Sequence, residues 1–372
     1  MLVRKGNGKY AMNLQYKPDW EETKARYRAW WNHAYFGRCA LAVYAPHEPR
    51  PDLPEPAGPK TLEERWFDLE AINRRAQHAM ASTFYGGEAI PIWSGGYPGH
   101  TCLPVFMGAT CTLDMHTGWI EPVIHQEDEP DIRRLKIDTE HPNYRLAVES
   151  VVRGSAWMRG KGLMTIGAFG GCGDTLAALR TTDRLLYDCV DRPDWVRDAE
   201  CHLMDLWCDH YGMLYRNICE ADEGSTCWFP LWAPGKFYAA QNDFAYMIGP
   251  GMFQDLFLPA IRRQLDYLDY AVYHVDGIGN FAHVDTLCGL ERLQAIQILP
   301  GAGKPSPLHF IDVLRKVQRA GKNLHISLPA DEVRSALDQL SARGLYIQTW
   351  CRSEPEARGL LEQAERWSVD RG

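Results

Sequence analysis

Between residues 142 and 367, short apolar runs alternate with segments of helical length and periodicity. The runs that predict buried strands are LMTIGAFG, TCWFPLWAP, AVYHVDG, AIQIL, LHISL and LYIQTW. The segments that predict helices lie near 142–160, 174–190, 193–219, 250–268, 280–290, 307–320, 331–343 and 354–367. Because strands separated by such helices pair in parallel, the sequence predicts an α/β fold. About seven or eight such units favour a closed (β/α)8 barrel of the TIM type over an open sheet.

The N-terminal part has a different character. Residues 1–37 predict a helix, and the run CALAVYAP that follows predicts a buried strand. The proline-rich stretch HEPRPDLPEPAGPK must run over the surface before a helix that begins near Thr61, which forms a capping box with Glu64. We therefore expect a helical and loop-rich extension, residues 1–60, packed on a barrel of residues 61–372, with a long loop region near 86–130.

Composition excludes several classes of protein. The chain has 372 residues and a net charge of −8, without a Lys/Arg-rich block, so charge-driven binding to nucleic acid or to an anionic membrane is not expected. No apolar run is long enough to span a bilayer, and the N-terminus lacks the apolar core of a signal peptide, which makes the cytoplasm the expected compartment. The 11 cysteines are odd in number and form no CxxC pair, which argues against a disulfide framework.

Nucleotide-binding loops are also absent from the sequence, which contains neither GxGxxG nor a Walker A motif. The glycines at 170, 171 and 173 follow a predicted strand, but their spacing is typical of a turn. With 13 Trp and 17 Tyr, many beside Gly or Pro, the composition instead favours a pocket for a small organic ligand.

Residues that follow the predicted strands are the candidate site, because active sites of such barrels lie at the carboxyl ends of the strands. His274 and Asp276 are two apart at a strand end and should point to the same side, as two metal ligands or as a His oriented by a carboxylate. Cys351 follows the last strand and would complete an N, O and S ligand set with an open position, as catalytic zinc requires. The alternatives are a helix-capping His with a turn-forming Asp, and a Cys buried as a small apolar residue. His325 is a reserve ligand or a core residue.

Asp174 is the candidate general acid or base. It follows the glycine turn and precedes Arg180, and burial would raise its pKa. Its alternative role is an ordinary helix N-cap. Aromatic residues that could stack on substrate, or hold a quaternary ammonium ion, are Trp228, Trp232, Tyr238 and Tyr273. The loop region would supply a lid or pocket wall from Trp93, Tyr97, His100, Asp114, His116 and His125.

Four segments resemble, in order, the uroporphyrinogen decarboxylase superfamily: DTLAALRTTDRLLYDCVDRP, MIGPGMFQDLFLPAIRRQ, YHVDGIGN and WCRSEPEARGLLEQAE. The resemblance spans about residues 163–365 and implies a (β/α)8 barrel. The metal-free decarboxylases of this superfamily carry an arginine-rich N-terminal segment, and nothing in residues 1–60 is similar to it.

The other branch consists of cobalamin-dependent methyltransferases with zinc held by a His-x-Cys pair and a later Cys. The resemblance implies His274 as the first ligand and Cys351 as the last, with Asp276 in place of the middle Cys. A carboxylate there hardens the site and favours polarising an oxygen over activating a thiolate. The segment from Asp114 to Gly118 comes close to the corrinoid-binding motif, but its glycine is one place early, so any corrinoid would be carried by a separate protein.

The sequence thus predicts a zinc-dependent methyltransferase that acts on a small methylated compound with a corrinoid protein as partner. Asp174 and His274 would be catalytic, and His274, Asp276 and Cys351 would hold the metal. The alternative is a barrel lyase or hydrolase, decarboxylase-like, in which Asp174 and His274 exchange protons with a small polar or sugar-like substrate. A third reading is a small-molecule binding protein without catalysis. A homodimer is the default assembly for such an enzyme, although no face is indicated.

Overall fold

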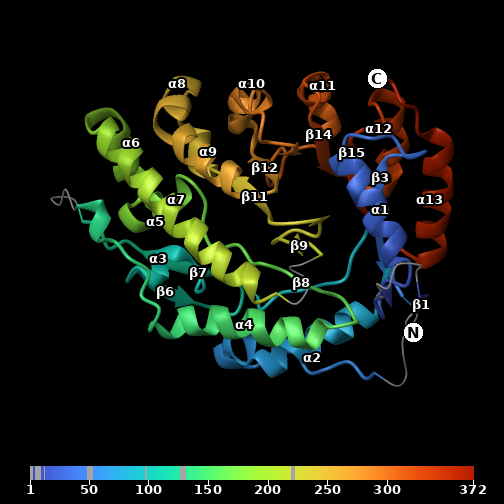
Figure 1. Cartoon of the computed structure of the whole chain (residues 1–372), viewed down its shortest axis with the longest axis horizontal. Helices are drawn as coiled ribbons and strands as arrows, with labels where there is room; N and C mark the ends of the chain where they lie inside the picture. Colours follow the sequence, from blue (N-terminus) through green and yellow to red (C-terminus); the bar gives the residue numbers. More distant parts are fainter. Residues whose placement is uncertain are drawn as a thin grey trace.

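A computed structural model describes residues 3–4, 10–11, 13–47, 53–96, 99–125, 131–218 and 223–372. The fold is mixed α/β, as the alternating pattern predicts, with helices packed around a central sheet (Figure 1). The strands are β1 Val3–Arg4, β2 Tyr10–Ala11, β3 Ala40–Pro46, β4 Thr83–Gly87, β5 Ile92–Trp93, β6 Thr110–Leu113, β7 Gly118–Glu121, β8 Leu163–Met164, β9 Ser225–Thr226, β10 Trp232–Ala233, β11 Phe237–Gln241, β12 Tyr270–Asp276, β13 Ala295–Leu299, β14 Asn323–Ser327 and β15 Leu345–Trp350.

The α-helices are α1 Trp20–Trp31, α2 Leu69–Ala81, α3 Leu103–Phe106, α4 Pro142–Met158, α5 Asp174–Arg180, α6 Thr182–Asp191, α7 Pro193–Arg216, α8 Pro250–Met252, α9 Leu258–Tyr267, α10 Val284–Cys288, α11 Ile311–Arg319, α12 Val333–Gln339 and α13 Glu354–Trp367. The 3-10 and π segments are η1 Glu63–Phe67, η2 Ile132–Arg134, η3 Asp243–Met247, η4 Phe253–Phe257, η5 Ile278–His283, η6 Pro307–Phe310 and η7 Ala330–Glu332. The predicted helix near Thr61 thus begins as η1, and the Thr61 hydroxyl accepts a hydrogen bond from the backbone N–H of Glu64 (3.2 Å).

The central sheet has seven strands in the order β11-β12-β13-β14-β15-β3-β4. All neighbours from β11 to β3 are parallel, and β4 closes the edge antiparallel to β3. β3 lies within residues 1–60, so the predicted N-terminal extension supplies a strand to the sheet. The predicted domain boundary at residue 60 stays a prediction. Parallel pairing brings the carboxyl ends of β11, β12 and β13 to one edge, where ligands bind in folds of this class.

Short pairs of strands lie beyond the central sheet. β5 pairs in parallel with β8, and Thr165, just after β8, forms a single bridge with Thr226 of β9. β9 and β10 are antiparallel, and β6 and β7 form a hairpin within the loop region near 86–130.

The predicted strand at 226–234 is wrong. Pro230 and Pro234 have no N–H to donate to a ladder, and the segment turns back between β9 and β10. The long strand of this region is β11, in the run FYAAQ, whose two alanines gave a weak strand signal. The predicted strand at 163–170 is also shorter, because it ends before Gly167 and Gly170.

Residue Thr181 divides the helix predicted at 174–190 into α5 and α6. Its φ is +84°, a conformation that β-branched residues adopt only under strain. The strain is accommodated because the Thr181 hydroxyl caps α6 by accepting from the backbone N–H of Arg184 (3.4 Å).

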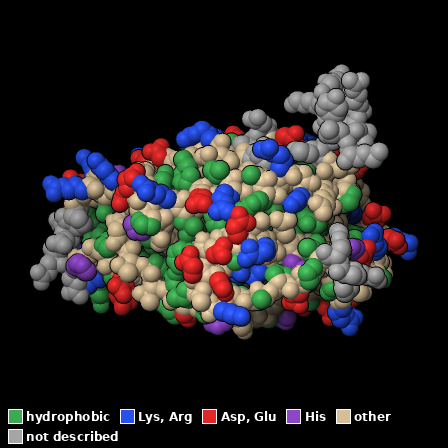
Figure 2. Space-filling view, turned by 90° about the horizontal axis from the view of Figure 1, so that it is seen from below, with side chains coloured by type: hydrophobic (Ala, Val, Ile, Leu, Met, Phe, Trp, Pro, Cys, Tyr) green, Lys and Arg blue, Asp and Glu red, His purple; other side chains and the backbone are tan. Residues whose placement is uncertain are grey.

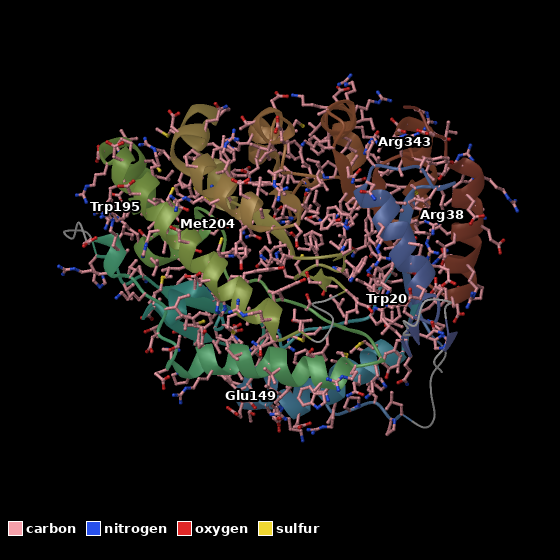
Figure 3. All side chains as sticks on the ribbon, in the orientation of Figure 1. Trp20, Arg38, Glu149, Trp195, Met204 and Arg343 are labelled. Atoms are coloured by element: carbon pink, nitrogen blue, oxygen red, sulfur yellow. The ribbon has the colours of Figure 1, made fainter. Side chains whose placement is uncertain are left out.

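A buried ion network joins α1 to the sheet. Glu88 is fully buried and accepts hydrogen bonds from Arg38 (2.6 and 2.8 Å), Arg26 (2.5 Å) and the backbone N–H of Leu41 (2.6 Å). Burial alone would raise the pKa of Glu88, but the Arg38 and Arg26 charges and these hydrogen bonds lower it to about 2. Figure 3 shows Arg38 and Trp20 on the side of the molecule formed by α1 and α13.

The surface carries charges of both signs. On the face in Figure 2, which includes α2 and α4, Lys and Arg side chains lie among Asp and Glu side chains. No helix among the described residues is both long and apolar enough to cross a membrane.

Candidate functional site

A row of polar side chains crosses the sheet near the carboxyl ends of its strands. Gln241, His274, Gln297 and His325 are successive cross-strand partners on β11, β12, β13 and β14. Partners in register point to the same face of a sheet, so the row is continuous. His274 Nδ1 is hydrogen-bonded to Gln297 Oε1, which fixes the imidazole ring against β13.

A cavity of about 320 Å³ opens beside the first half of this row. It lies between the start of α5 and the ends of β11 and β12. The residues on which its chemistry depends are Asp174, Thr175, Trp228, Tyr238, Asp243 and His274. Four of these, Asp174, Trp228, Tyr238 and His274, are among the residues that the sequence predicted, so the structure brings them together around one space.

Asp174 lies at this cavity as the first residue of α5, and the capping position is Gly173. Its carboxylate accepts hydrogen bonds from Gln241 Nε2 (3.0 Å) and from the backbone N–H of Phe244 (3.0 Å). Burial, together with the nearby carboxylate of Asp243, nevertheless raises the pKa of Asp174 to about 7. A carboxyl group with that pKa can give or take a proton near neutral pH.

Two further carboxylates extend this acidic region. Burial and the charge of Asp276 raise the pKa of Asp243 to about 6. Asp276 lies at the end of β12, with its Oδ2 4.0 Å from His274 Nε2. Asp174 and Asp243 therefore share a poorly solvated space, which disfavours their simultaneous ionisation.

His274 is 8% exposed, and burial lowers its pKa, which keeps the ring neutral. A neutral ring that donates from Nδ1 to Gln297 Oε1 carries no proton on Nε2, the nitrogen nearer Asp276. Trp228 packs edge-on against this ring, with centroids 5.0 Å apart. Nε2 is therefore a proton acceptor at the cavity wall.

Glu200 of α7 supports the turn before Asp174 from behind. Its carboxylate is 1% exposed and accepts from the backbone N–H of Gly173 (2.9 Å) and from Cys172 Sγ (3.1 Å). Burial raises the pKa of Glu200 to about 7. Gly173 has a φ of +77°, and an added Cβ would lie 2.2 Å from Asn242 Oδ1, so glycine is required at this position.

The residues predicted to bind zinc are not gathered as a ligand set. No group of three or more His, Cys, Asp or Glu side chains within the described ranges is arranged to hold a metal ion. Cys351 follows β15, three strands along the sheet from β12, and its backbone N–H donates to Tyr44 O (2.8 Å). Burial raises the pKa of its thiol to about 11. His274, Asp276 and Cys351 therefore do not fit a three-ligand zinc site in this arrangement.

Three predicted substrate-binding aromatics lie in the core and do not line the cavity that Asp174 and His274 share. Trp93 is buried on β5 against Trp157, and Trp232 is buried on β10 against Trp20. Tyr273 is buried on β12, and burial raises its pKa well above the usual value. Side chains along β12 alternate between the two faces of the sheet, so Tyr273, the neighbour of His274, points to the other face.

The predicted loop residues are dispersed. His116 lies in the turn between β6 and β7, where Asp114 Oδ1 accepts from its backbone N–H (2.6 Å), so this segment is a hairpin turn rather than a corrinoid-binding loop. His100 is buried beside Phe67, and the carbonyl oxygen of His125 accepts from Arg180 Nη1 (3.1 Å). Tyr97 lies outside the described residues.

Two other predicted candidates have structural partners. The side chain of Arg180 is buried in an ion pair with Asp188 and does not reach the cavity. His325 is 1% exposed and packs against Phe229 and Tyr346, as the core alternative predicts.

Four residues that matter at the site were missed by the sequence reasoning: Gln241, Asp243, Glu200 and Gln297. Gln241 ends β11 and Asp243 follows it, and the sequence placed the strand of this region in a different segment. Glu200 lies in the middle of a helix, and only the fold brings it to the Gly173 turn.

Comparison with known proteins gives a likeness of fold. No model of a protein family matches the sequence, and no curated protein is similar to it. Among solved structures, a methyltransferase from Methanosarcina mazei superposes with a TM-score of 0.62 at 10% sequence identity. The superposition covers 92% of this chain and 98% of the other. The two proteins therefore share their fold over nearly their whole lengths.

Proposed function

We propose that this protein is a methyltransferase-type enzyme that acts on a small methylated compound in the 320 Å³ cavity. The observation that carries the proposal is the fold shared with a methyltransferase over 92% of the chain. The cavity supports it, because it lies at the carboxyl ends of parallel strands and holds a carboxyl group poised near neutral pH. We also propose that the strands of the central sheet that pair in parallel, from β11 to β3, close with short strands beyond the sheet into a (β/α)8 barrel.

Asp174 controls a proton in this proposal. When a methyl group leaves a heteroatom, the bond between carbon and heteroatom breaks and the heteroatom keeps the electron pair. That atom leaves readily only if it carries a proton or a further substituent. Asp174, with a pKa of about 7, holds the proton at the leaving atom, and Gln241 and the Phe244 backbone N–H orient its carboxyl group.

We propose that the methyl acceptor is a corrinoid carried by a separate protein. A corrinoid supplies a strongly nucleophilic metal centre that takes up a methyl group. Zinc does not enter the proposal, because the residues predicted to bind it do not fit a three-ligand site. The work of this chain is to bind the methylated compound, exclude water and hold the proton.

Methyl transfer to free cob(I)alamin tests this function. The purified full-length protein is mixed with cob(I)alamin and a panel of O-, S- and N-methylated compounds, and methylcobalamin is followed by its absorbance. We expect turnover with at least one compound, and a loss of about a hundredfold or more in the Asp174→Asn variant. No turnover with any compound, alone or with a cell extract that supplies corrinoid proteins, contradicts the proposal.

A second candidate is a lyase or hydrolase that uses acid–base chemistry. The observation that favours it is the pairing, in one cavity, of a carboxyl group of pKa about 7 with a neutral imidazole whose Nε2 is free. Substrate consumption that needs no methyl acceptor and is abolished in both Asp174→Asn and His274→Ala would establish this candidate in place of the first.

A further inference from the structure

Most of the polar side-chain atoms that the cavity offers to a ligand are acceptors. Asp174 and Asp243 present carboxyl oxygens, and His274 presents an unprotonated Nε2, because Nδ1 is engaged with Gln297. His274 is more than nine-tenths buried, and Nε2 has no hydrogen-bond partner among the described residues. Thr175, 3% exposed, also lines the cavity, with its hydroxyl oxygen unpartnered within the described part of the chain.

Two of the donors around the cavity are already occupied. Gln241 Nε2 donates to Asp174, and the Tyr238 hydroxyl donates to Gly167 O (3.2 Å). The described residues that line the cavity include no Lys or Arg. The same holds for the outer groove of about 560 Å³, which is continuous with the cavity at Asp174 and Asp243. An anionic ligand would therefore find no positive charge there, and the Thr175 hydroxyl and Trp228 Nε1–H, unpartnered among the described residues, are neutral donors.

The titratable groups around the cavity do not supply a positive charge either. The titratable groups that face Asp174 and Asp243 are Cys172, Glu200, Tyr273, His274 and Asp276. None of them carries a positive charge at neutral pH while His274 is neutral. A cation in the cavity would relieve the repulsion between the carboxylates and allow both to ionise.

The walls of the cavity favour an organic cation over a metal ion. Trp228 and Tyr238 contribute aromatic surface, which attracts alkylated ammonium groups by cation–π interaction. The volume corresponds to roughly ten water molecules, far more than a bare ion needs. In addition, the described residues form no three-ligand group for a metal.

We propose that this cavity binds a small N-alkylated ammonium compound, held by Asp174 and Asp243 and by the ring of Trp228. The proposal deepens the proposed function, on which it rests for the identity of the cavity as the substrate site. It also supplies a chemical reason for the choice, since an ammonium nitrogen that loses a methyl group leaves as a neutral amine. Asp174 then pairs with the positive charge before transfer and holds the proton of an amine that is not fully alkylated.

Isothermal titration calorimetry with matched ligands tests the proposal without turnover. The probes are choline, its uncharged isostere 3,3-dimethylbutan-1-ol, acetate and zinc chloride, each titrated into the full-length protein. We expect choline to bind at least about tenfold more tightly than the isostere, and acetate not to bind. Choline binding should strengthen from about pH 6 to about pH 8 and release protons, seen as a heat that depends on the buffer.

Variants locate the binding site. Asp243→Asn should weaken choline binding about tenfold or more, and Trp228→Leu should do so without changing the pH dependence. The matched control is Asp312→Asn, the same change at an exposed position of α11, which should bind choline as the wild type does. Circular dichroism spectra that match the wild type show that each variant is folded.

Three results overturn the proposal: equal affinity for choline and its isostere, choline binding that Asp243→Asn leaves unchanged, or stoichiometric zinc binding that excludes choline. The proposed function is tested separately by methylcobalamin formation. Choline binding without methyl transfer from any compound would therefore refute the methyltransferase and retain the ammonium site. Methyl transfer from O- or S-methyl compounds without choline binding would retain the methyltransferase and refute the ammonium site.

Discussion

Gln241 and Asp174 are joined by a 3.0 Å hydrogen bond between the end of β11 and the start of α5. The amide of Gln241 stabilises the ionised carboxylate and so opposes the burial that raises the pKa of Asp174. In Gln241→Leu we expect this pKa to rise further, which moves any activity that needs ionised Asp174 to higher pH. Infrared spectroscopy of the protonated carboxyl band, assigned by its loss in Asp174→Asn, measures the shift. An unchanged pKa of Asp174 in Gln241→Leu would show that this hydrogen bond does not stabilise the ionised carboxylate.

Asp174 should lower the free energy of unfolding of the protein at neutral pH. Its pKa is raised from 3.8 to about 7 in the folded state, so the folded state holds its proton more tightly than the unfolded state. The favourable contribution is complete below about pH 4 and is lost as the pH rises through about 7. Asp174→Asn should therefore melt at a higher temperature than the wild type near pH 8, and the difference should shrink towards pH 4. A difference that grows towards low pH would contradict the raised pKa.

Glu200 should affect activity through the backbone N–H of Gly173, which donates a hydrogen bond of 2.9 Å to the Glu200 carboxylate. Glu200→Ala leaves this buried donor without a partner and should lower kcat about tenfold or more, because the turn that carries Asp174 loosens. Glu200→Gln keeps an acceptor oxygen and should restore most of the activity. Comparison of kcat in the methyl-transfer assay decides the point. Equal loss in both variants would assign the effect to the charge instead.

Gly173→Ala should be far more damaging than alanine at another glycine of similar backbone conformation. Gly173 and Gly321 have φ values of +77° and +71°, so alanine is strained at both. Only at Gly173 would the new Cβ collide with a neighbour, at 2.2 Å from Asn242 Oδ1, whereas nothing lies within 4 Å at Gly321. Thermal unfolding should show a loss of about 1–2 kcal/mol for Gly321→Ala and a clearly larger loss for Gly173→Ala.

Glu88→Gln should destabilise the protein in a pH-dependent way. The pKa of Glu88 is lowered from 4.5 to about 2, which corresponds to about 3 kcal/mol of stability above pH 4.5. This contribution is lost as the pH falls through about 2, so the deficit of the variant should shrink as the solution is acidified. Urea unfolding at two pH values measures it. Glu149→Gln, at an exposed ion pair on α4 (Figure 3), is the control and should change stability by less than about 0.5 kcal/mol.

The sequence was sufficient where local rules decide the structure. The helix predicted at 193–219 is α7, Pro193–Arg216, because proline at its first position and an amphipathic pattern specify it. The period of two along β12 placed His274 and Asp276 on one side, and His274 Nε2 lies 4.0 Å from Asp276 Oδ2. The functional roles of these residues stay predictions.

Long-range contacts were beyond the sequence. Nothing local marks Glu200 as the partner of Gly173, 27 residues away. Two alanines concealed β11, and with it Gln241 and Asp243. The ligand set that the resemblance implied places Cys351 three strands from His274, a separation that a motif in order along the chain does not reveal.

The position of β3 has a consequence for how the chain acquires its structure during synthesis. β3 is the earliest long strand to leave the ribosome, yet its parallel neighbour is β15, which is completed only at Trp350. Loop closure over some three hundred residues is entropically costly and slow. The exposed backbone of β3 must wait for almost the entire polypeptide, and until then β4 is the partner with which it can form a hairpin.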